Sequence, residues 1–376
     1  MSEKLTVGII GCGAMARHHV RGYLECDRYR VVALADLSSQ AMQEFDGLFG
    51  DSDDYDPRHY TDATAMLDTE DLDVVSVCVW HRGHAKWTIA AAARRPKAIL
   101  CEKPMADNLA RADEMRVACR RNEVKLVIGH QRRFLPSYNA VRKLIAEGAV
   151  GEVQLMRSIS GVGLLNWSSH HFDMFRYILG DDDCEWVMGA IERQTDRFER
   201  TTRIEDRAVG VFGFGGGAEA MLTSDFTPDF YQGCTIYGSE GTIELRPTHY
   251  RLLNADTGGV SEHRAPTGPS VEAGQEGIQE YDAGGAQAME LADWVQDKVE
   301  VHRGEATHGY KSLEMAMALY ESARLHERVV LPLKTRVSPL DLMVESGHLP
   351  VRYPGRYDIR AFLLRGENMD SDANNA

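Results

Sequence analysis

The chain of 376 residues contains no long hydrophobic run, since no stretch approaches the roughly 18–20 consecutive apolar residues that cross a bilayer as a helix. It has no large basic patch either: the longest basic cluster is Arg132-Arg133. Lysine and arginine together number 42 against 57 aspartates and glutamates, which gives a formal net charge of −15. A surface this acidic repels phosphate backbones and anionic headgroups. The sequence therefore excludes nucleic acids and membranes as partners.

Cysteine is also sparse. The seven cysteines are odd in number, lie far apart and form no Cys-x-x-Cys pair, which argues against a disulfide framework. The first residues, Met1 to Thr6, show no charged n-region, apolar h-region or cleavage site of a secretory signal. We therefore expect a reduced, cytoplasmic protein.

The first half of the chain alternates short apolar runs with helical patterns. The runs expected to be strands are 5–10, 29–36, 74–80, 98–101 and 124–128. The helices expected between them are 14–25, a helix capped by Ser38, 84–95 and 108–122. Such alternation predicts right-handed crossovers and an α/β fold with a doubly wound parallel sheet, a Rossmann domain over residues 1–130.

The second half has a different pattern. Segments 153–159, 207–214, 217–226 and 234–244 alternate apolar and polar residues, which predicts an antiparallel sheet with one wet face. Helices are expected over 137–147, 286–301 and 313–327, and a strand over 329–333. We assign residues 131–335 to an α+β domain with a mostly antiparallel sheet and 336–376 to a C-terminal extension.

Two segments of the second half have little apolar content. Residues 254–285 are 32 residues long with seven glycines, and they form either a surface excursion or a mobile flap over a site. Residues 369–376 are polar and expected to be disordered.

A glycine-rich turn lies between the first strand and the first helix. In Gly11-x-Gly13-x-x-Ala16 the first glycine allows a tight turn, the second lets the backbone approach a pyrophosphate, and the alanine lets helix and strand pack closely. The free N–H groups at the helix start, around Ala14 and Met15, then face the phosphates. The turn alone is a weak indication, because glycines also end strands for purely structural reasons.

Asp36 strengthens the indication. It follows Gly13 by 23 residues and ends the second strand, where a carboxylate accepts hydrogen bonds from both ribose hydroxyls and repels a 2′-phosphate. Leu37 and Ser38 follow, with no arginine to bind that phosphate. The sequence predicts NAD as the cofactor in preference to NADP; the alternative is an aspartate that only caps a helix.

A charged pair, Glu102-Lys103, ends the strand 98–101 and precedes Pro104. In open α/β sheets ligands bind at this end of the strands. A lysine there can bind a substrate hydroxyl and stabilise a developing alkoxide. The alternative is a strand-ending salt bridge followed by a helix-starting proline.

Glu-Lys-Pro at this position resembles the signature of the glucose–fructose oxidoreductase, inositol dehydrogenase and rhizopine catabolism (Gfo/Idh/MocA) family. The resemblance covers about residues 5–335. The further segments that carry it, in the family's order, are the glycine turn, Gly129-His130-Gln131-Arg132-Arg133-Phe134-Leu135-Pro136, Glu147-Gly148-Ala149-Val150-Gly151-Glu152, Ser169-His170-His171-Phe172-Asp173 and Val329-Val330-Leu331-Pro332-Leu333.

The resemblance implies a Rossmann domain followed by an α/β domain whose open sheet often forms the interface of a homodimer or homotetramer. It implies hydride transfer between NAD or NADP and a carbinol of a sugar or cyclitol. Lys103 matches the lysine that contacts the reacting hydroxyl, with Glu102 positioned near the nicotinamide ribose. His170 matches the histidine that exchanges a proton with the substrate oxygen, and Asp173 would lie one helical turn further on.

The chain departs from the family pattern at Asn166, where many members carry an aspartate four residues before the histidine. A carboxamide accepts a hydrogen bond from an imidazole but cannot stabilise an imidazolium by charge. Some relatives that act on sugar nucleotides or glycosides look similar here. The departure argues against a simple inositol dehydrogenase. Trp167, the next residue, either stacks on a sugar or fills the core.

Several histidines near these motifs have two interpretations. Trp80, His81 and His84 follow the strand 74–80, where they contact nicotinamide or substrate, or serve as caps and packing. His18-His19 is interpreted as a helix face near the phosphates. His170-His171 with Asp173 would supply three metal ligands, but adjacent histidines point apart, so we expect no metal.

Arg132 and Arg133 follow the last Rossmann strand. They either anchor the cofactor or a polar substrate group, or form an interdomain salt bridge.

Three functions remain open at this point. The first is an NAD-dependent sugar or cyclitol dehydrogenase. The second, known among relatives, is a redox-neutral glycosidase in which oxidation at C3 acidifies C2–H, the aglycone is eliminated, water adds and NADH returns its hydride. The third is a regulatory protein that only binds NAD; Lys103 and His170 argue against it.

Overall fold

The computed structural model describes residues 4–161, 163–199, 202–227, 231–264 and 283–359, and these form two compact units. The first unit holds the residues up to 131 together with a returning segment that ends at 309. The second begins at residue 132 and resumes at 310. Most of the glycine-rich segment 254–285 and the whole of 369–376 lie outside the described residues.

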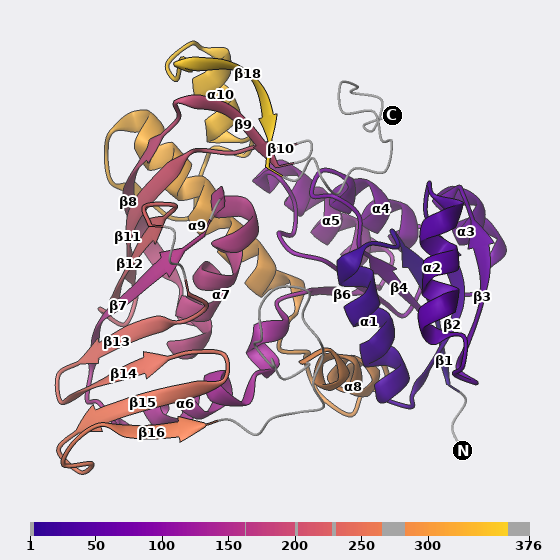
Figure 1. Cartoon of the computed structure of the whole chain (residues 1–376), viewed down its shortest axis with the longest axis horizontal. Coiled ribbons are helices and arrows are strands. Elements are labelled where there is room, and N and C mark those ends of the chain that lie inside the picture. The colour runs from indigo at the N-terminus through magenta and orange to yellow at the C-terminus, as the bar shows by residue number, and fades with distance from the viewer. Residues whose placement is uncertain (1–3, 162, 200–201, 228–230, 265–282, 360–376) are drawn as a thin grey trace. The chain divides into compact units, whose positions relative to one another are not determined.

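The first unit is built on a six-stranded sheet in the order β3-β2-β1-β4-β5-β6, with every neighbouring pair parallel (Figure 1). Its strands are β1 (Leu5–Ile10), β2 (Tyr29–Ala35), β3 (Tyr55–Tyr60), β4 (Val74–Val77), β5 (Ala98–Cys101) and β6 (Lys125–Ile128). The strand order reverses between β1 and β4, and in such sheets the ligand crevice lies beyond the carboxyl ends at that point. The predicted doubly wound parallel sheet is confirmed.

The helices of this unit are α1 (Ala14–Glu25), α2 (Ser39–Phe49), α3 (Ala63–Thr69), α4 (Gly83–Ala92), α5 (Leu109–Arg121) and α8 (Ala283–Val295). The predicted cap of α2 is present, because the Ser38 hydroxyl accepts a hydrogen bond from the Ala41 amide at 3.2 Å. Asn108 caps α5 in the same way through the Arg111 amide at 3.0 Å.

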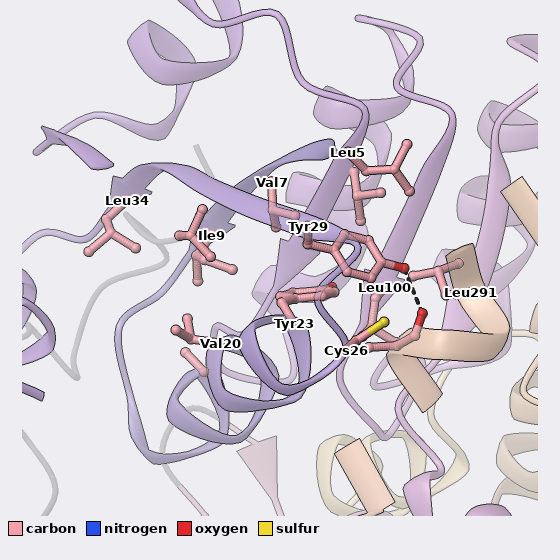
Figure 2. Close-up of a cluster of buried hydrophobic side chains, with 14 of the residues drawn as sticks. Leu5, Val7, Ile9, Val20, Tyr23, Cys26, Tyr29, Leu34, Leu100 and Leu291 are labelled. Carbon is pink, nitrogen blue, oxygen red and sulfur yellow. Dashed lines mark hydrogen bonds between the residues drawn. The ribbon is translucent and has the colours of Figure 1, made fainter. Parts of the chain in front are cut away.

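Helix α8 joins the first unit although it is far from it in sequence. Figure 2 shows its Leu291 beside Tyr29 of β2, whose hydroxyl donates a 2.7 Å hydrogen bond to the Ala288 carbonyl. Leu291 and Ala292 are fully buried in the same cluster as Val20 of α1. The predicted boundaries place this helix in the second domain, but burial of its apolar face against α1 and β2 places it in the first.

The second unit contains a nine-stranded sheet in the order β16-β15-β14-β13-β7-β12-β11-β8-β17. Its strands are β7 (Val153–Ser160), β8 (Cys184–Glu192), β11 (Arg207–Phe214), β12 (Glu219–Ser224), β13 (Cys234–Gly238), β14 (Gly241–Leu245), β15 (His249–Asn254), β16 (Ser261–Arg264) and β17 (Val329–Val330). The β7–β12 pair is parallel and the other pairs of this sheet are antiparallel. The predicted mostly antiparallel sheet is confirmed, and the segment predicted as one strand over 234–244 is a hairpin.

Helices α7 (Ser169–Ile178) and α9 (Ala306–Leu325) lie against this sheet (Figure 1). Phe172 of α7 packs on Phe212 of β11 with ring centroids 5.3 Å apart. Leu319 of α9 lies against two glycines, Gly189 and Gly210, where added Cβ atoms would be only 3.0 and 2.6 Å from its side chain. The helix approaches the sheet this closely because both positions lack a side chain.

The C-terminal extension contributes a strand of its own. β18 (Tyr353–Asp358) pairs parallel with β9 (Thr195–Glu199), which also pairs with β10 (Thr202–Arg203). The remaining helical elements are η1 (Gln131–Phe134), α6 (Pro136–Ala146), η2 (Gly163–Trp167) and α10 (Pro339–Glu345). None of the helices in the described ranges is long and apolar enough to cross a bilayer. No disulfide joins any of the seven cysteines, all of which are described.

The contact between α1 and α8 is open to a direct test with two helical glycines. A Cβ at Gly22 of α1 would lie 2.6 Å from the Gly284 backbone, whereas one at Gly47 of α2 would meet nothing within 4 Å. We expect Gly22→Ala to lower the free energy of unfolding by about 1–3 kcal/mol through overpacking. Gly47→Ala should raise it by about 0.5–1 kcal/mol, because alanine restricts the unfolded chain. Urea unfolding measures both, and equal effects would contradict the α1–α8 packing.

Candidate functional site

The turn after β1 leaves open space at the start of α1. Gly11 has φ +91°, and a Cβ there would lie 2.8 Å from the Cys78 carbonyl oxygen, so only glycine fits. Gly13 is the N-cap of α1 without a side-chain cap, and a Cβ on it would meet nothing within 4 Å. The backbone amides of Ala14 and Met15 therefore begin the helix beside an unobstructed space that suits a phosphate.

Asp36 lies at the same turn. Its Oδ2 accepts a hydrogen bond from the Cys12 amide at 2.7 Å and its Oδ1 accepts one from the Ser38 amide at 2.8 Å. Each carboxylate oxygen keeps a further lone pair for a hydroxyl donor. The next residue, Leu37, is 78% exposed and carries no charge that would attract a phosphate. The geometry brings Gly11, Gly13 and Asp36 together at the turn between β1 and α1.

Glu102 is a buried carboxylate directly after β5. Its Oε2 accepts a 3.2 Å hydrogen bond from the Lys103 amide, and its Oε1 lies 2.9 Å from Nε2 of His19 in α1. Burial opposes the charge, but the hydrogen bond to His19 and the charges of His19, Lys103 and His84 outweigh it, so the pKa of Glu102 is lowered. Glu102 is therefore ionised at neutral pH. Lys103 is half-buried, and the peptide bond between it and Pro104 is cis.

His84 of α4 is turned toward the same segment. Its Nδ1 lies 2.7 Å from the Pro104 carbonyl oxygen and its Nε2 lies 3.0 Å from the Val79 carbonyl oxygen. Carbonyls only accept, so both contacts are hydrogen bonds at once when the ring carries two N–H protons. His81 is buried with its ring centroid 6.0 Å from that of His84, and Trp80 is half-buried. These three residues lie beyond the carboxyl end of β4.

In the second unit the π-helix η2 carries two predicted site residues, Asn166 and Trp167, both half-buried. The Asn166 amide donates a 2.5 Å hydrogen bond to Oε1 of Glu199, which is 1% exposed. π-helical turns are rare in proteins, and those that occur often lie at functional sites. Asn166 therefore serves here as a donor to a buried carboxylate.

A second buried glutamate holds the start of η2. Glu205 accepts hydrogen bonds from the Leu164 amide at 2.8 Å and from the Tyr320 hydroxyl at 2.5 Å. Burial raises the pKa of Glu205, although these two donors and the charge of Arg197 oppose the rise. Neither Glu199 nor Glu205 is predicted from the sequence, because a glutamate in a polar segment carries no sign of burial.

The adjacent histidines of α7 have different surroundings. Nδ1 of His171 lies 2.5 Å from the Ser158 hydroxyl, which itself donates to the Gly233 carbonyl. Burial and the charge of Arg132 lower the pKa of His171 to about 3, so its imidazole is neutral. His170 is also buried, at 6% exposed. The described residues contain no group of three or more His, Cys, Asp or Glu side chains that could hold a metal ion.

Arg133 is 1% exposed and forms ion pairs within its own unit. Its guanidinium binds Asp173 at 2.7 Å and Asp181 at 2.8 Å. Burial acts to lower the pKa of Arg133, but the two carboxylates raise it above its ordinary value. Arg132 is half-buried in η1. Of the two interpretations of Arg133, a ligand contact or a salt bridge, the structure has a buried ion pair, which lies within the second unit.

The Arg133 ion pair predicts a large cost for removing one partner. We expect Asp173→Asn to lower the free energy of unfolding by about 3 kcal/mol, the lower end of the cost of breaking a buried ion pair, since Asp181 remains as the second carboxylate of the buried guanidinium. The control is Glu192→Gln, which removes an exposed ion pair with Arg207 in the same unit and should cost under about 1 kcal/mol. Urea unfolding of both variants measures the difference, and similar losses would show that the Arg133 pair is not buried.

The two units match two family models in chain order. Residues 5–130 match the model described as "Oxidoreductase family, NAD-binding Rossmann fold". Residues 143–331 match the model described as "Oxidoreductase family, C-terminal alpha/beta domain". Together they account for the larger part of the chain.

Individual relatives agree with this assignment. The chain is 25% identical to the myo-inositol 2-dehydrogenase of Thermotoga maritima over 64% of this chain and 74% of the relative. It is 30% identical to the 1,5-anhydro-D-fructose reductase of Ensifer adhaerens over 63% and 74%, respectively. A structure of levoglucosan dehydrogenase with NADH and levoglucosan superimposes with a TM-score of 0.75 at 20% identity, covering 88% of this chain and all of that one, which supports the fold. With both family models matched, the chain belongs to the Gfo/Idh/MocA oxidoreductase family and carries that family's NAD-binding Rossmann domain.

Proposed function

We propose that the protein is an NAD-dependent oxidoreductase whose substrate is a secondary alcohol of a sugar, cyclitol or glycoside. The observation that carries the proposal is the ionised Glu102 beside Lys103 at the carboxyl end of β5. This is the same edge of the parallel sheet as Gly11 after β1 and Asp36 after β2. Relatives named for myo-inositol and 1,5-anhydrofructose support a polyhydroxylated substrate.

The residues of the first unit fit the cofactor. The amides of Ala14 and Met15 and the glycines of the turn would hold the pyrophosphate, and Asp36 would accept the ribose hydroxyls. Further cofactor contacts are proposed for residues near the carboxyl ends of β4, β5 and β6: Trp80, His81, His84, Glu102, Lys103 and Arg132. When bound, NAD supplies the acceptor for the hydride that leaves the carbinol carbon.

Lys103 is proposed to bind the reacting hydroxyl. Its ammonium would stabilise the negative charge that develops on the oxygen as the proton leaves. The ionised Glu102 next to it keeps the positive charge of Lys103 favourable at this half-buried position. The lysine thus acts as an electrostatic partner, while proton removal needs another group.

His170 is proposed as that group. Its neighbour His171 is poorly suited to it, because burial lowers its pKa to about 3 and Ser158 occupies its Nδ1. Asn166 and Trp167 of η2 are proposed to contact the substrate, and Glu199 fixes the Asn166 amide. Arg133 contributes indirectly, since its guanidinium is held by Asp173 and Asp181.

We also propose a cytoplasmic homo-oligomer assembled through the nine-stranded sheet. The support is a set of exposed apolar side chains on its strands, Met188, Tyr237, Leu253 and Val330.

The experiment that tests the function is a substrate panel with NAD and with NADP. Free sugars, cyclitols and nitrophenyl glycosides are incubated with the protein while NADH and aglycone are followed together. NADH formed from a free sugar or cyclitol supports the proposal. NAD-dependent aglycone release without net NADH would identify a redox-neutral glycosidase, and neither product from any compound would contradict both.

Replacing the lysine separates chemistry from cofactor binding. We expect Lys103→Met to abolish turnover, since no other charge replaces the ammonium, while the dissociation constant for NAD remains near that of the wild type. Stopped-flow NADH formation and a fluorescence titration with NADH measure the two properties. Retained turnover would remove Lys103 from the mechanism.

Asn166 predicts a shift in the pH profile. Asn166→Asp places a second carboxylate against Glu199, and the loss of the amide donor should cost about 1–3 kcal/mol of stability. The new charge should also move the apparent pKa of turnover upward, because a carboxylate four residues before His170 favours the imidazolium. The double variant Asn166→Asp/Glu199→Gln restores a donor–acceptor pair and should recover stability while keeping the upward shift. An unchanged pH profile in both variants would refute a role of position 166 in proton transfer.

A further inference from the structure

His19 lies at the centre of a buried polar chain that the proposed mechanism does not use. It is 7% exposed in α1, with Nε2 2.9 Å from Glu102 Oε1 and Nδ1 3.1 Å from the Ser76 hydroxyl of β4. The Tyr23 hydroxyl lies 2.7 Å from the same serine oxygen. Three elements, α1, β4 and the segment after β5, are thereby joined through side chains alone.

The directions of these hydrogen bonds follow from chemistry. An ionised Glu102 can only accept, so His19 donates from Nε2. Burial raises the pKa of Tyr23, which keeps its phenol protonated and able to donate to Ser76. Ser76 can then donate to His19 Nδ1. With a neutral His19 every donor in the chain points toward the glutamate, and such aligned hydrogen bonds strengthen one another. With a protonated His19, whose charge lowers the pKa of Glu102, Nδ1 donates to Ser76 instead, and the bond from Nε2 to Glu102 is the same in both forms.

The Glu102 carboxylate is fixed at both oxygens. Oε1 is bonded to His19 and Oε2 to the Lys103 amide. Behind it, a Cβ at Gly129 would lie 2.9 Å from Oε1, so the backbone after β6 closes that side. The carboxylate therefore has one placement, and the imidazole determines it from the α1 side.

We propose that His19 is a positioning residue of the reaction: by holding Glu102, it fixes the first residue of the Glu102–Pro104 segment and with it the place of the Lys103 ammonium. This inference rests on the proposed function, in which Lys103 binds the reacting hydroxyl. Helix α1 begins at the glycine turn and carries His19 near its middle. One rigid element therefore aligns the phosphate-facing turn with the segment that bears the lysine.

The test compares two substitutions that both remove the imidazole ring. His19→Gln keeps an N–H that can reach Glu102, whereas His19→Leu removes it with similar bulk. The other groups whose charges act on or couple to Glu102 are His84 of α4, the adjacent Lys103, and the thiols of Cys78 and Cys101; all are unchanged in both variants. Any difference between the two variants that depends on pH then reports on Glu102.

The first readout is the urea midpoint between pH 4 and 7, without cofactor. A carboxyl whose folded pKa lies below its unfolded value stabilises the fold above the unfolded pKa and loses this contribution as pH falls. We expect His19→Gln to keep this behaviour. In His19→Leu burial acts without the donor, so the gap between the two variants should widen as pH rises from 4 to 7. The pH dependence of the gap should disappear in a Glu102→Gln background, because the amide does not ionise.

Val20→Ala serves as the packing control. Val20 is fully buried beside His19 in α1, so its truncation should lower the urea midpoint by the same amount at every pH. A gap between His19→Gln and His19→Leu that is equally independent of pH would overturn the inference.

The second readout is turnover on the substrate found in the panel. We expect kcat of His19→Leu to fall about 10- to 100-fold, the effect of losing a hydrogen bond to a charged group, with the NAD dissociation constant unchanged. His19→Gln should recover most of kcat. Wild-type kcat in His19→Leu would overturn the positioning role. Absence of wild-type turnover on every carbinol would contradict the proposed function instead, and the stability series would still show whether His19 holds Glu102.

Discussion

A single buried negative charge organises the first unit around its ligand edge. The Glu102 carboxylate is nearly inaccessible to solvent, and an ion in that position is stable only when it is fully hydrogen-bonded and neighboured by positive charge. His19 and the Lys103 amide satisfy its two oxygens, and His84 and Lys103 supply positive charge. The segments that meet this requirement are the ones that border the cofactor turn. The groups that stabilise the Glu102 carboxylate thus come from α1, from α4 and from the segment after β5.

The second unit also contains buried charged groups, and they are stabilised by different partners. The Leu164 amide lies in the first turn of η2, where a helix offers no internal acceptor, and Glu205 accepts from it and from Tyr320 of α9. Glu199 accepts from the side chain of Asn166. A buried arginine with two aspartates anchors the following region. Each unit therefore holds its candidate catalytic side chain, Lys103 or His170, on a scaffold of buried ionisable groups.

Local patterns in the sequence predicted much of this architecture. The apolar runs of β1, β2 and β5 and the cap at Ser38 follow from short-range chemistry, and the structure has them. β3 was not predicted, because its sequence Tyr-Asp-Pro-Arg-His-Tyr is polar and contains a proline, which an edge strand tolerates. The glycine turn and Asp36 could be interpreted from sequence for the same reason: each acts within a few residues of itself.

Contacts between residues far apart in the sequence could not be predicted from local patterns. Nothing in the sequence near Glu199 or Glu205 predicts burial, since a carboxylate is buried only when remote donors surround it. The role of His19 was likewise hidden, because its partner is 83 residues away. The sequence of α8 shows an apolar face but does not show which elements this face packs against. In the structure it packs against α1 and β2.

The return of α8 to the first unit has a consequence for biosynthesis. Residues 132–281 are in effect an insertion into the Rossmann unit, whose core is completed by Leu291 and Ala292. A ribosome that has made the first 131 residues has produced the whole parallel sheet but not the helix that covers Tyr29. The nascent Rossmann unit must wait, with an apolar surface uncovered, until the inserted unit has been synthesised. The order of folding along this chain is therefore not the order of its domains.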